Sequence, residues 1–439
     1  MNTCKHLHIM KKTIFPQDET FWHLKSTDTK PLHTNKETEI VVIGGGMAGI
    51  TAAQAFAQKG KKVILLEAFY CGSGASGKSS GFIEPNCEIS LSEFIERYGI
   101  EAGKTIWQLI QQDGVEHIRN NITHHNIDCD YTVQDSIDVA SSAKDIPDIL
   151  SEVEHLAQNG FTTQFIKKED IPSIIGTDNY FGGVIYANSF GINGYKYCQA
   201  MKNILLRDGV EIYEETPALS IKNHVVSTLH ATIKAEHIII CADRSIPTLG
   251  KLTQEIYHVQ NFLLASEILT PETIHKIFPQ KKLMVCDTEL VYNFYRMTGD
   301  RLLVGGGSLL NLYNTSESYH NTRMYKKLTR YIQNTFNLHI QFEQMWPGLI
   351  GVSKDIAPLA GPDKDSPHIY YIGAATGLPI AAMLGNYCAD HIIDGADTLK
   401  NYFSPYRKFP ISGFAQTVLG KKLTFALSHW LSHIRSKHV

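Results

Sequence analysis

The chain has 439 residues, of which 43% are hydrophobic and 19% are charged, and its formal net charge is −3 at pH 7. The length predicts two domains, and the composition is that of an ordinary globular protein. The slightly acidic balance speaks against a nucleic-acid partner.

The eight cysteines are scattered along the chain and form no Cys-x-x-Cys pair. A chain of this size does not need disulfides, so we expect reduced thiols and a cytoplasmic location. No Cys/His group has the spacing of metal ligands, and no metal site is predicted. The N-terminal residues MNTCKHLHIMKKTIFPQDETFWHL lack the apolar core of a signal peptide, and no apolar run reaches the length of a membrane span.

Residues 38–68, TEIVVIGGGMAGITAAQAFAQKGKKVILLEA, begin with the clearest motif of the chain. Residues 40–43 are apolar and rich in β-branched side chains, which is typical of a strand buried on both faces. Gly44, Gly46 and Gly49 then form the pattern G-x-G-x-x-G. The first glycine allows a tight turn, the second lets a pyrophosphate approach the backbone, and the third lets the next helix pack closely on the strand.

The rest of this stretch completes a dinucleotide-binding unit. Residues 47–59 have the apolar spacing of a helix, and Gly60 follows as a C-terminal cap. Residues 63–66 predict a second buried strand, which Glu67 closes. An acid about twenty residues past the glycines can accept hydrogen bonds from an adenosine ribose.

Residues 71–83, CGSGASGKSSGFI, form a second cluster of glycines and serines. Such a loop exposes backbone N–H groups and hydroxyls that can wrap a phosphate or a planar ring. The alternative is a flexible surface loop.

Further elements follow in the middle of the chain. Residues 90–121 predict helices, and residues 181–193 predict a strand and a turn. Residues 235–245 predict a short buried strand that returns the chain to the nucleotide-binding domain. Residues 290–307, LVYNFYRMTGDRLLVGGG, predict a β-hairpin with its turn at residues 298–300.

A third nucleotide-binding signature lies late in the chain. Residues 369–372 predict a buried strand, Gly373 and Gly377 a turn, and residues 379–393 an apolar helix. The N-terminus of that helix carries a partial positive charge.

Because these signatures are separated in sequence, we expect an α/β fold with two discontinuous domains and a ligand between them. One would be a Rossmann-like βαβ domain, and the other an α+β substrate domain built on a mostly antiparallel sheet. The expected ranges are 37–90, 193–248 and 343–400 for the nucleotide-binding domain, 91–192 and 249–342 for the substrate domain, 1–36 for an N-terminal lead-in, and 401–439 for a C-terminal amphipathic extension.

The sequence resembles the D-amino-acid-oxidase-like FAD-dependent oxidoreductases, the group of glycine oxidase, sarcosine oxidase and D-amino-acid dehydrogenase. The resemblance covers residues 19–405. It rests on VVIGGGMAGITAA, LLEA, GSGASGKSSGFI, YRMTGDRLLVGGG, and WPGL leading to IYYIGAATGL. Within the family the chain is most similar to γ-glutamylputrescine oxidase, whose Ser-Tyr-Trp opening resembles ETFWHL.

The resemblance implies FAD as the cofactor. Relatives that link FAD covalently use a cysteine just after the late tryptophan, where this chain has Gly348, so we expect noncovalent FAD. The implied FAD contacts lie in the three glycine-rich segments and at two further strand ends: Gly44, Gly46, Met47, Ala48, Gly49, Glu67, Ala68, Gly74, Ala75, Ser76, Ser79, Ser80, Gly81, Phe82, Ala218, Ala242, Gly373, Thr376, Gly377 and Leu378.

The family also implies oxidation of a C–N bond by hydride transfer to flavin N5, followed by hydrolysis of the imine. In glycine oxidase two arginines bind the substrate carboxylate, and this chain has Ile350 and Thr376 at the corresponding positions. A desolvated carboxylate without a partner costs several kcal/mol. We therefore favour a γ-glutamylputrescine-like or other long-chain amine, although Arg296 or Arg244 can supply a positive charge from another wall.

Two other functions stay open. The first is an oxidase or dehydrogenase of α-amino acids or N-methyl-amino acids, of the D-amino acid, glycine or sarcosine type. The second is a flavin-binding module without catalytic activity.

The candidate catalytic residues are Tyr292, Tyr295, Arg296 and His258. In a strand, Tyr292 and Arg296 share one face and Tyr295 lies on the other. Aromatic walls can hold an alkylamine over the flavin, and a histidine can act as the general base that keeps the amine neutral. The alternatives are core packing for the tyrosines and an ion pair with Asp300 for Arg296.

The C-terminal residues 417–439 carry an apolar helical stripe with basic residues near its ends. This helix either docks on the protein or lies in a membrane interface as a peripheral contact. The second case would favour a quinone as the electron acceptor, and the first leaves oxygen.

Overall fold

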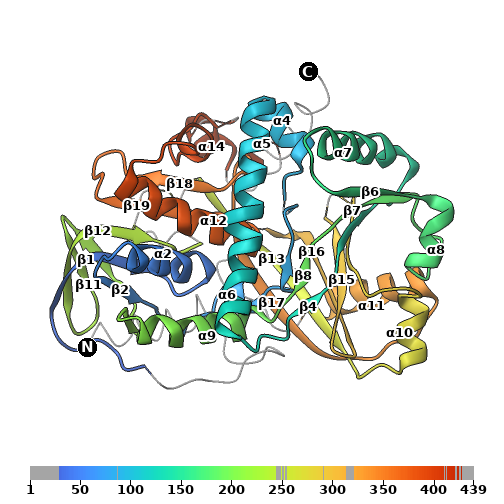
Figure 1. Cartoon of the computed structure of the whole chain (residues 1–439), viewed down its shortest axis with the longest axis horizontal. Helices are drawn as coiled ribbons and strands as arrows, with labels where there is room; N and C mark the ends of the chain where they lie inside the picture. Colours follow the sequence, from blue (N-terminus) through green and yellow to red (C-terminus); the bar gives the residue numbers. More distant parts are fainter. Residues whose placement is uncertain are drawn as a thin grey trace.

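Two eight-stranded β-sheets form the frame of the protein, and a long helical segment runs between them (Figure 1). The computed structural model describes residues 29–86, 88–243, 249, 252, 255–289, 291–312, 321–409, 411, 413–420, 423–424 and 427.

The first sheet carries the glycine motif and is parallel at its centre. β1 (Lys36–Ile43) pairs in parallel with β2 (Val63–Leu66) on one side and with β12 (Thr232–Ile240) on the other. The last four residues of β1 are all buried, as their apolar β-branched side chains predict. The remaining strands of this sheet are β9 (Glu211–Tyr213), β10 (Ser220–Lys222), β11 (Val225–Ser227), β18 (Leu359–Pro362) and β19 (Ile369–Gly373).

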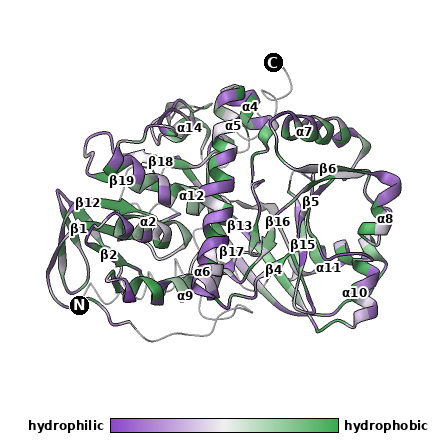
Figure 2. Cartoon of the chain, viewed as in Figure 1, coloured by the Kyte–Doolittle hydropathy of each residue, from purple (hydrophilic) through white to green (hydrophobic). Residues whose placement is uncertain are grey.

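The two helices that follow glycine turns pack against each other beside this sheet. α2 (Met47–Gln58) follows β1, and α12 (Leu378–Ala389) follows β19. A Cβ atom on Gly385 would lie 2.7 Å from the carbonyl oxygen of Ala48, so glycine permits this close helix contact. Both helices are mostly hydrophobic, as Figure 2 shows by their green colour.

The other helices near the first sheet form the central segment and its surroundings. The central segment joins α5, the π-helical stretch η1 and α6, and its buried side chains share a hydrophobic core with α2 and α12. The bounds are α3 (Ala75–Lys78), α4 (Leu91–Tyr98), α5 (Ile100–Leu109), η1 (Ile110–Glu116), α6 (His117–His125), α9 (Gly194–Arg207), η5 (Asp390–Asp394), α13 (Lys400–Phe403) and α14 (Gly413–Leu419).

The second sheet has the order β17-β13-β16-β15-β14-β5-β7-β6 and is antiparallel except for the β14–β5 pair. Its strands are β5 (Ser136–Val139), β6 (Thr163–Lys167), β7 (Gly182–Tyr186), β13 (Ile256–Ser266), β14 (Met284–Asp287), β15 (Asn293–Thr298), β16 (Arg301–Leu312) and β17 (Phe342–Ser353). A small third sheet joins β3 (Phe82–Ile83), β8 (Phe190–Gly191) and β4 (Thr132–Val133).

The two faces of the second sheet have different coverings. α11 (Thr322–Phe336) packs its apolar side against Phe262, Leu264 and Val304 on one face. The opposite face carries Leu263, Phe294 and Trp346, which pack with Phe82 and Tyr195 from the other half of the molecule. We call the face that carries Leu263, Phe294 and Trp346 the front face. The outer helices of this half are α7 (Ile146–Gln158), α8 (Ile171–Ile174) and α10 (Pro271–Ile277).

The predicted fold class is confirmed: the chain combines a Rossmann-like sheet with a mostly antiparallel second sheet. The predicted domain limits differ in two places. Residues 342–353 form β17, which pairs with β13 in the second sheet, so the chain returns to the first sheet only at β18. Helices α4–α6, expected with the substrate domain, share the core of α2 and α12.

The two chain ends lie largely outside the described residues. This applies to the lead-in up to residue 28 and to most of residues 421–439, so the C-terminal helix stays a prediction. Within the described part of the chain, no helix combines the length and apolar character of a membrane span. In the same part of the chain, no three His, Cys, Asp or Glu side chains are grouped as metal ligands would be.

Candidate functional site

The glycine turn after β1 has the geometry that a pyrophosphate site needs. Gly44 has a φ of +113°, and a Cβ atom there would lie 2.7 Å from the carbonyl oxygen of Cys241. A Cβ atom on Gly49 would lie 1.9 Å from the carbonyl oxygen of Gly44. Gly46 precedes α2 without a side-chain cap of its own, and an anion is favoured at such a helix start.

Glu67 stands at the end of β2, beside this turn. Its Oε2 accepts a hydrogen bond from the Gly45 N–H at 2.7 Å, and its Oε1 accepts one from the Phe69 N–H at 2.9 Å. Burial raises the pKa of this carboxyl, and the two backbone N–H donors oppose that rise. Glu67 therefore holds the glycine turn in place, a role that the sequence did not predict. It does so from the position at which the sequence predicts an acid that binds the ribose. Ala68 follows it and is half-buried.

The serine-rich loop lies directly over the start of α2. Ser76 Oγ accepts a hydrogen bond from the Met47 N–H at 2.9 Å. Ser79 Oγ donates to the Ser76 carbonyl at 3.0 Å and accepts from the Gly81 N–H at 3.3 Å. These hydrogen bonds fold the serine-rich loop, from Gly74 to Phe82, into a compact arch next to the glycine turn, which we call the serine-rich arch.

Two side chains of the second sheet hold this arch. Trp346 Nε1 on β17 donates to the Lys78 carbonyl at 3.0 Å. Arg296 on β15 donates from Nε to the Ser80 carbonyl at 2.6 Å. The serine-rich loop therefore lies between the two sheets, where the sequence predicts the flavin.

The late glycine turn also fits a cofactor. Gly373 ends β19, and Gly377, with a φ of +97°, precedes α12 without a side-chain cap. Between them, the Thr376 hydroxyl is buried and has no hydrogen-bond partner among the described residues. An unsatisfied buried hydroxyl costs about 1–3 kcal/mol, which a polar cofactor atom would offset.

The remaining predicted FAD residues lie at the strand ends of the first sheet. The Ala242 nitrogen would be 3.6 Å from a Cβ atom on Gly44, next to Cys241. Ala218 is buried with Ile43 and Leu66 in the core at the same sheet. The structure therefore brings the predicted segments together, and they fit FAD.

The front face leaves open space beside the serine-rich arch. Gly348 is buried, yet a Cβ atom there would meet no atom within 4 Å. It lies two residues from Trp346, on the same face of β17. Across the sheet Gly348 pairs with Asn261, which pairs with Gly307.

Tyr292 lies at the far end of this row, and the structure places it on the front face beside Phe294. Its hydroxyl donates to Glu88 Oε1 at 2.6 Å, and its ring is 5.9 Å from that of Phe294. Phe82 meets Phe294 edge-on at 5.8 Å. The loss of water around Glu88 raises the pKa of its carboxyl to about 7, although the Tyr292 hydrogen bond opposes the rise.

Tyr295 does not reach this site. As the strand alternation predicts, it points to the opposite face, where it is fully buried against Phe278 and Phe336. Its hydroxyl is 3.4 Å from that of Tyr180. The alternative of core packing therefore describes Tyr295.

Arg296 is also fully buried, and the alternative of an ion pair with Asp300 is wrong. Besides Ser80, it donates to the carbonyl oxygens of Ile192 at 2.7 Å and Met297 at 3.0 Å. Burial lowers the pKa of its guanidinium to about 10, so it stays charged at neutral pH. Each of its three nitrogens contacts a backbone carbonyl, which makes Arg296 a positioning residue for the serine-rich loop.

Two candidates remain, the general base His258 and the cation Arg244. His258 pairs with Gly351 on β17, and the strand alternation puts it on the face opposite Asn261 and Gly348. Arg244 lies outside the described residues.

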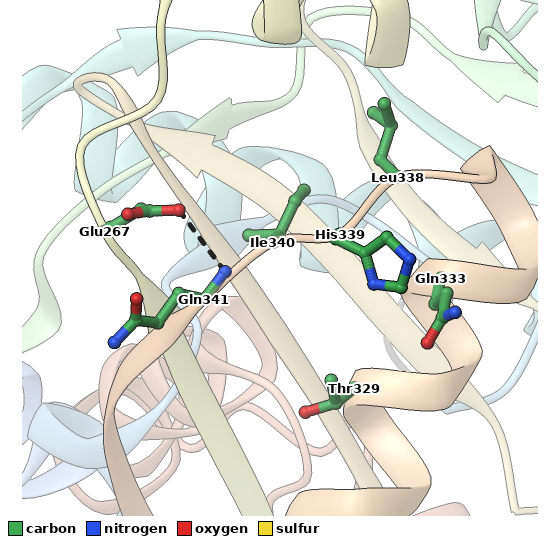
Figure 3. Close-up of a pocket in the computed structure, with 7 residues that line it drawn as sticks. All are labelled: Glu267, Thr329, Gln333, Leu338, His339, Ile340 and Gln341. Carbon is green, nitrogen blue, oxygen red and sulfur yellow. Dashed lines mark hydrogen bonds between the residues drawn. The ribbon is translucent and has the colours of Figure 1, made fainter.

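A cavity of about 350 Å³ lies away from these elements (Figure 3). It is formed by the end of α11 and the chain leading into β17, where the Gln341 N–H donates to Glu267 Oε1 at 3.4 Å. It contains no residue of the glycine segments or the front face, so we do not assign it to the cofactor. Its lining residues are Glu267, Thr329, Gln333, Leu338, His339, Ile340 and Gln341.

Comparisons with known proteins agree with this geometry. Residues 39–391 match the family described as FAD dependent oxidoreductase, DAO. A probable oxidoreductase of Haemophilus influenzae, OrdL, is 27% identical over 384 residues, which cover 84% of this chain and 86% of the relative. The gamma-glutamylputrescine oxidoreductase of Escherichia coli is 25% identical over 279 residues, covering 61% of this chain and 64% of that protein. Glycine oxidase from Geobacillus kaustophilus has a similar structure, with a TM-score of 0.69 at 16% identity over 86% of this chain and 100% of that chain.

The fold and the site thus define a flavin-dependent oxidoreductase. The chain belongs to the DAO family of FAD-dependent oxidoreductases. It is an enzyme that uses FAD and acts on a C–N bond of an amine or amino acid. The alternative of a flavin-binding module without activity is thereby set aside.

Proposed function

We propose that this enzyme oxidises the C–N bond of a long-chain amine, of the γ-glutamylputrescine type, and not an α-amino acid. The named activity of the Escherichia coli relative supports this choice. Oxygen or a quinone would accept the electrons, and FAD would be bound noncovalently because Gly348 stands where covalent relatives have a cysteine.

The observation that carries the proposal concerns the described positions of the sheet around Gly348, whose side chains offer no cation for an α-carboxylate. The front-face positions on both sides of it are Val259, Asn261, Gly307 and Ile350, and none of these is basic. Arg296, the arginine nearest in the hairpin, directs its nitrogens to backbone carbonyls. A carboxylate held here would lose its hydration without gaining an ion pair, at a cost of several kcal/mol.

When bound, FAD would supply the two-electron acceptor, taking a hydride from the carbon next to the substrate nitrogen. The residues of this chain would bind and orient the amine. Phe82, Phe294 and Tyr292 form an aromatic wall that suits an alkyl chain and excludes water. At the reacting end, away from Glu88, the loss of water lowers the pKa of an ammonium group and favours the neutral amine that the reaction needs.

Matched pairs of substrates test the proposal. Butane-1,4-diamine and ornithine differ only by a carboxylate, as do butylamine and norvaline, and both enantiomers of each amino acid are included. Bleaching of the flavin absorbance is followed without oxygen, and readmitting air shows whether oxygen is the acceptor. We expect each amine to reduce the flavin at least tenfold more efficiently than its amino acid. Faster reduction by the amino acids would establish the amino-acid oxidase or dehydrogenase alternative instead.

A further inference from the structure

We propose that Glu88 and Tyr292 form a binding site for a second cationic group of the amine substrate, remote from the C–N bond that is oxidised. The inference rests on the proposed function and names its substrate class: a chain with an amine at the reacting end and a cation, such as a second ammonium group, at the other.

The first argument is the position of the pair. Gly348, next to the open space beside the serine-rich arch, lies on β17. Tyr292 directly precedes β15, and β13 and β16 lie between these two strands. Three steps of about 4.8 Å between strands separate them by roughly 14 Å. A ligand that reaches from one to the other must be a long chain.

The second argument is that the side chains between Gly348 and Tyr292 rise little above the sheet. A Cβ atom on Gly305 would lie 2.1 Å from the ring of Phe294, and one on Gly307 would lie 2.5 Å from Asn261 Oδ1. Both glycines therefore let a neighbouring side chain lie flat against the sheet. This leaves room for an alkyl chain along the front face, with the Phe294 ring as an apolar floor.

The third argument is the chemistry of Glu88. It accepts a hydrogen bond from the Tyr292 hydroxyl, with 2.6 Å between the two oxygens, and, among the described residues, forms no ion pair with a lysine or arginine. The charges that act on it and on Tyr292 come from Glu84 and Glu93, which are acids, and from the Cys286 thiol. Both side chains of the pair are only half-buried.

A carboxylate in these surroundings favours a cationic ligand. Loss of water makes its charged form costly, and a bound ammonium group would offset that cost by an ion pair and a hydrogen bond. The same negative potential would disfavour a distal end that carries an anion without a cation. Glu88 is therefore a specificity-determining residue and takes no part in the transfer of electrons.

The test compares octane-1,8-diamine with octylamine, which differ in the distal amine alone. Binding to the full-length, FAD-loaded protein is measured by calorimetry at pH 8, where Glu88 is ionised. We expect the diamine to bind about tenfold more tightly than the monoamine. Glu88→Gln should remove this preference, while Glu93→Gln, which changes a neighbouring carboxylate directed at Arg97, should keep it.

The inference is overturned if the wild-type protein shows no preference, or if Glu88→Gln binds the diamine as tightly as wild type. Flavin reduction is then measured with the same two amines. If the diamine binds with the expected preference but neither amine bleaches the flavin, amine oxidation is wrong and the cation site stands. If both amines bleach the flavin while Glu88→Gln changes neither affinity, amine oxidation stands and the cation site is wrong.

Discussion

The glycine turn of the first sheet and the front face of the second are built by different means. At the turn, missing side chains let the backbone approach itself and the expected cofactor, as Gly44 and Gly49 show. On the front face, long side chains make the contacts: Arg296 and Trp346 donate hydrogen bonds to carbonyl groups of the serine-rich loop. One region depends on local spacing in the sequence, and the other on contacts between distant strands.

The largest effect is expected at the glycine turn. Gly49→Ala would place a methyl group 1.9 Å from the Gly44 carbonyl oxygen, forcing α2 away from β1. Such overpacking costs about 1–3 kcal/mol, so FAD affinity should fall by about 5- to 150-fold. Gly299→Ala is the control, since this residue lies in the turn between β15 and β16, outside the predicted FAD contacts, and a Cβ atom there meets nothing within 4 Å. Equal FAD content in the two purified variants would contradict this account of the turn.

A smaller effect is expected from Arg296→Met, which leaves three buried carbonyl groups without their donor. We expect the free energy of unfolding to fall by about 3 kcal/mol and FAD to bind more weakly. Arg296→Lys keeps the charge but cannot reach all three carbonyls, so its stability should be intermediate. The measurement is urea denaturation of each variant with and without FAD. Unchanged stability in Arg296→Met would show that the loop is held by other contacts.

Trp346→Phe is a milder change on the same loop. It keeps an aromatic ring in the core and removes the Nε1 donor to the Lys78 carbonyl. The expected cost is about 1 kcal/mol, which corresponds to a roughly fivefold faster loss of FAD. Flavin fluorescence after dilution of the loaded protein measures this rate. A rate equal to that of wild type would show that the indole N–H of Trp346 does not contribute to FAD binding.

The smallest effects distinguish Tyr292, which directly precedes β15, from Tyr295 within that strand. The Tyr292 hydroxyl lowers the pKa of Glu88, so Tyr292→Phe should move that pKa above its value of about 7. Diamine affinity, which requires the ionised carboxylate, should then fall with decreasing pH at a higher midpoint than in wild type. Tyr295→Phe removes a hydroxyl in the core and should leave the midpoint unchanged. Calorimetric titrations between pH 6 and pH 9 measure both, and equal midpoints in all three proteins would contradict the role of Tyr292.

The sequence predicted most of the first region because its signals are local. Strand β2 has the predicted limits, and α2 ends one residue before the predicted position, at a capping glycine with a positive φ. The third glycine, Gly49, is required because a Cβ atom there would meet the carbonyl oxygen of Gly44, five residues earlier. A fixed spacing in the sequence is therefore enough to predict this glycine.

The second region was predicted less well because its contacts are not local. Glu88 and Tyr292 are 204 residues apart, and no spacing rule connects them. Strand alternation predicted that Tyr292 and Tyr295 face opposite ways, but it does not say which face meets the cofactor loop. Arg296 has Asp300 close in sequence, yet its partners come from distant segments. The predicted domain boundary at residue 343 is wrong because β17 pairs with β13 and therefore belongs to the second sheet.

The contact between Arg296 and Ser80 has a consequence for how the protein assembles. The two residues are 216 positions apart, and Trp346 and Lys78 are 268 apart. The segment around the cofactor can therefore reach its final shape only after the last strands of the second sheet have formed. Heat should then release FAD and melt both sheets in one cooperative transition, because neither half completes the cofactor loop without the other.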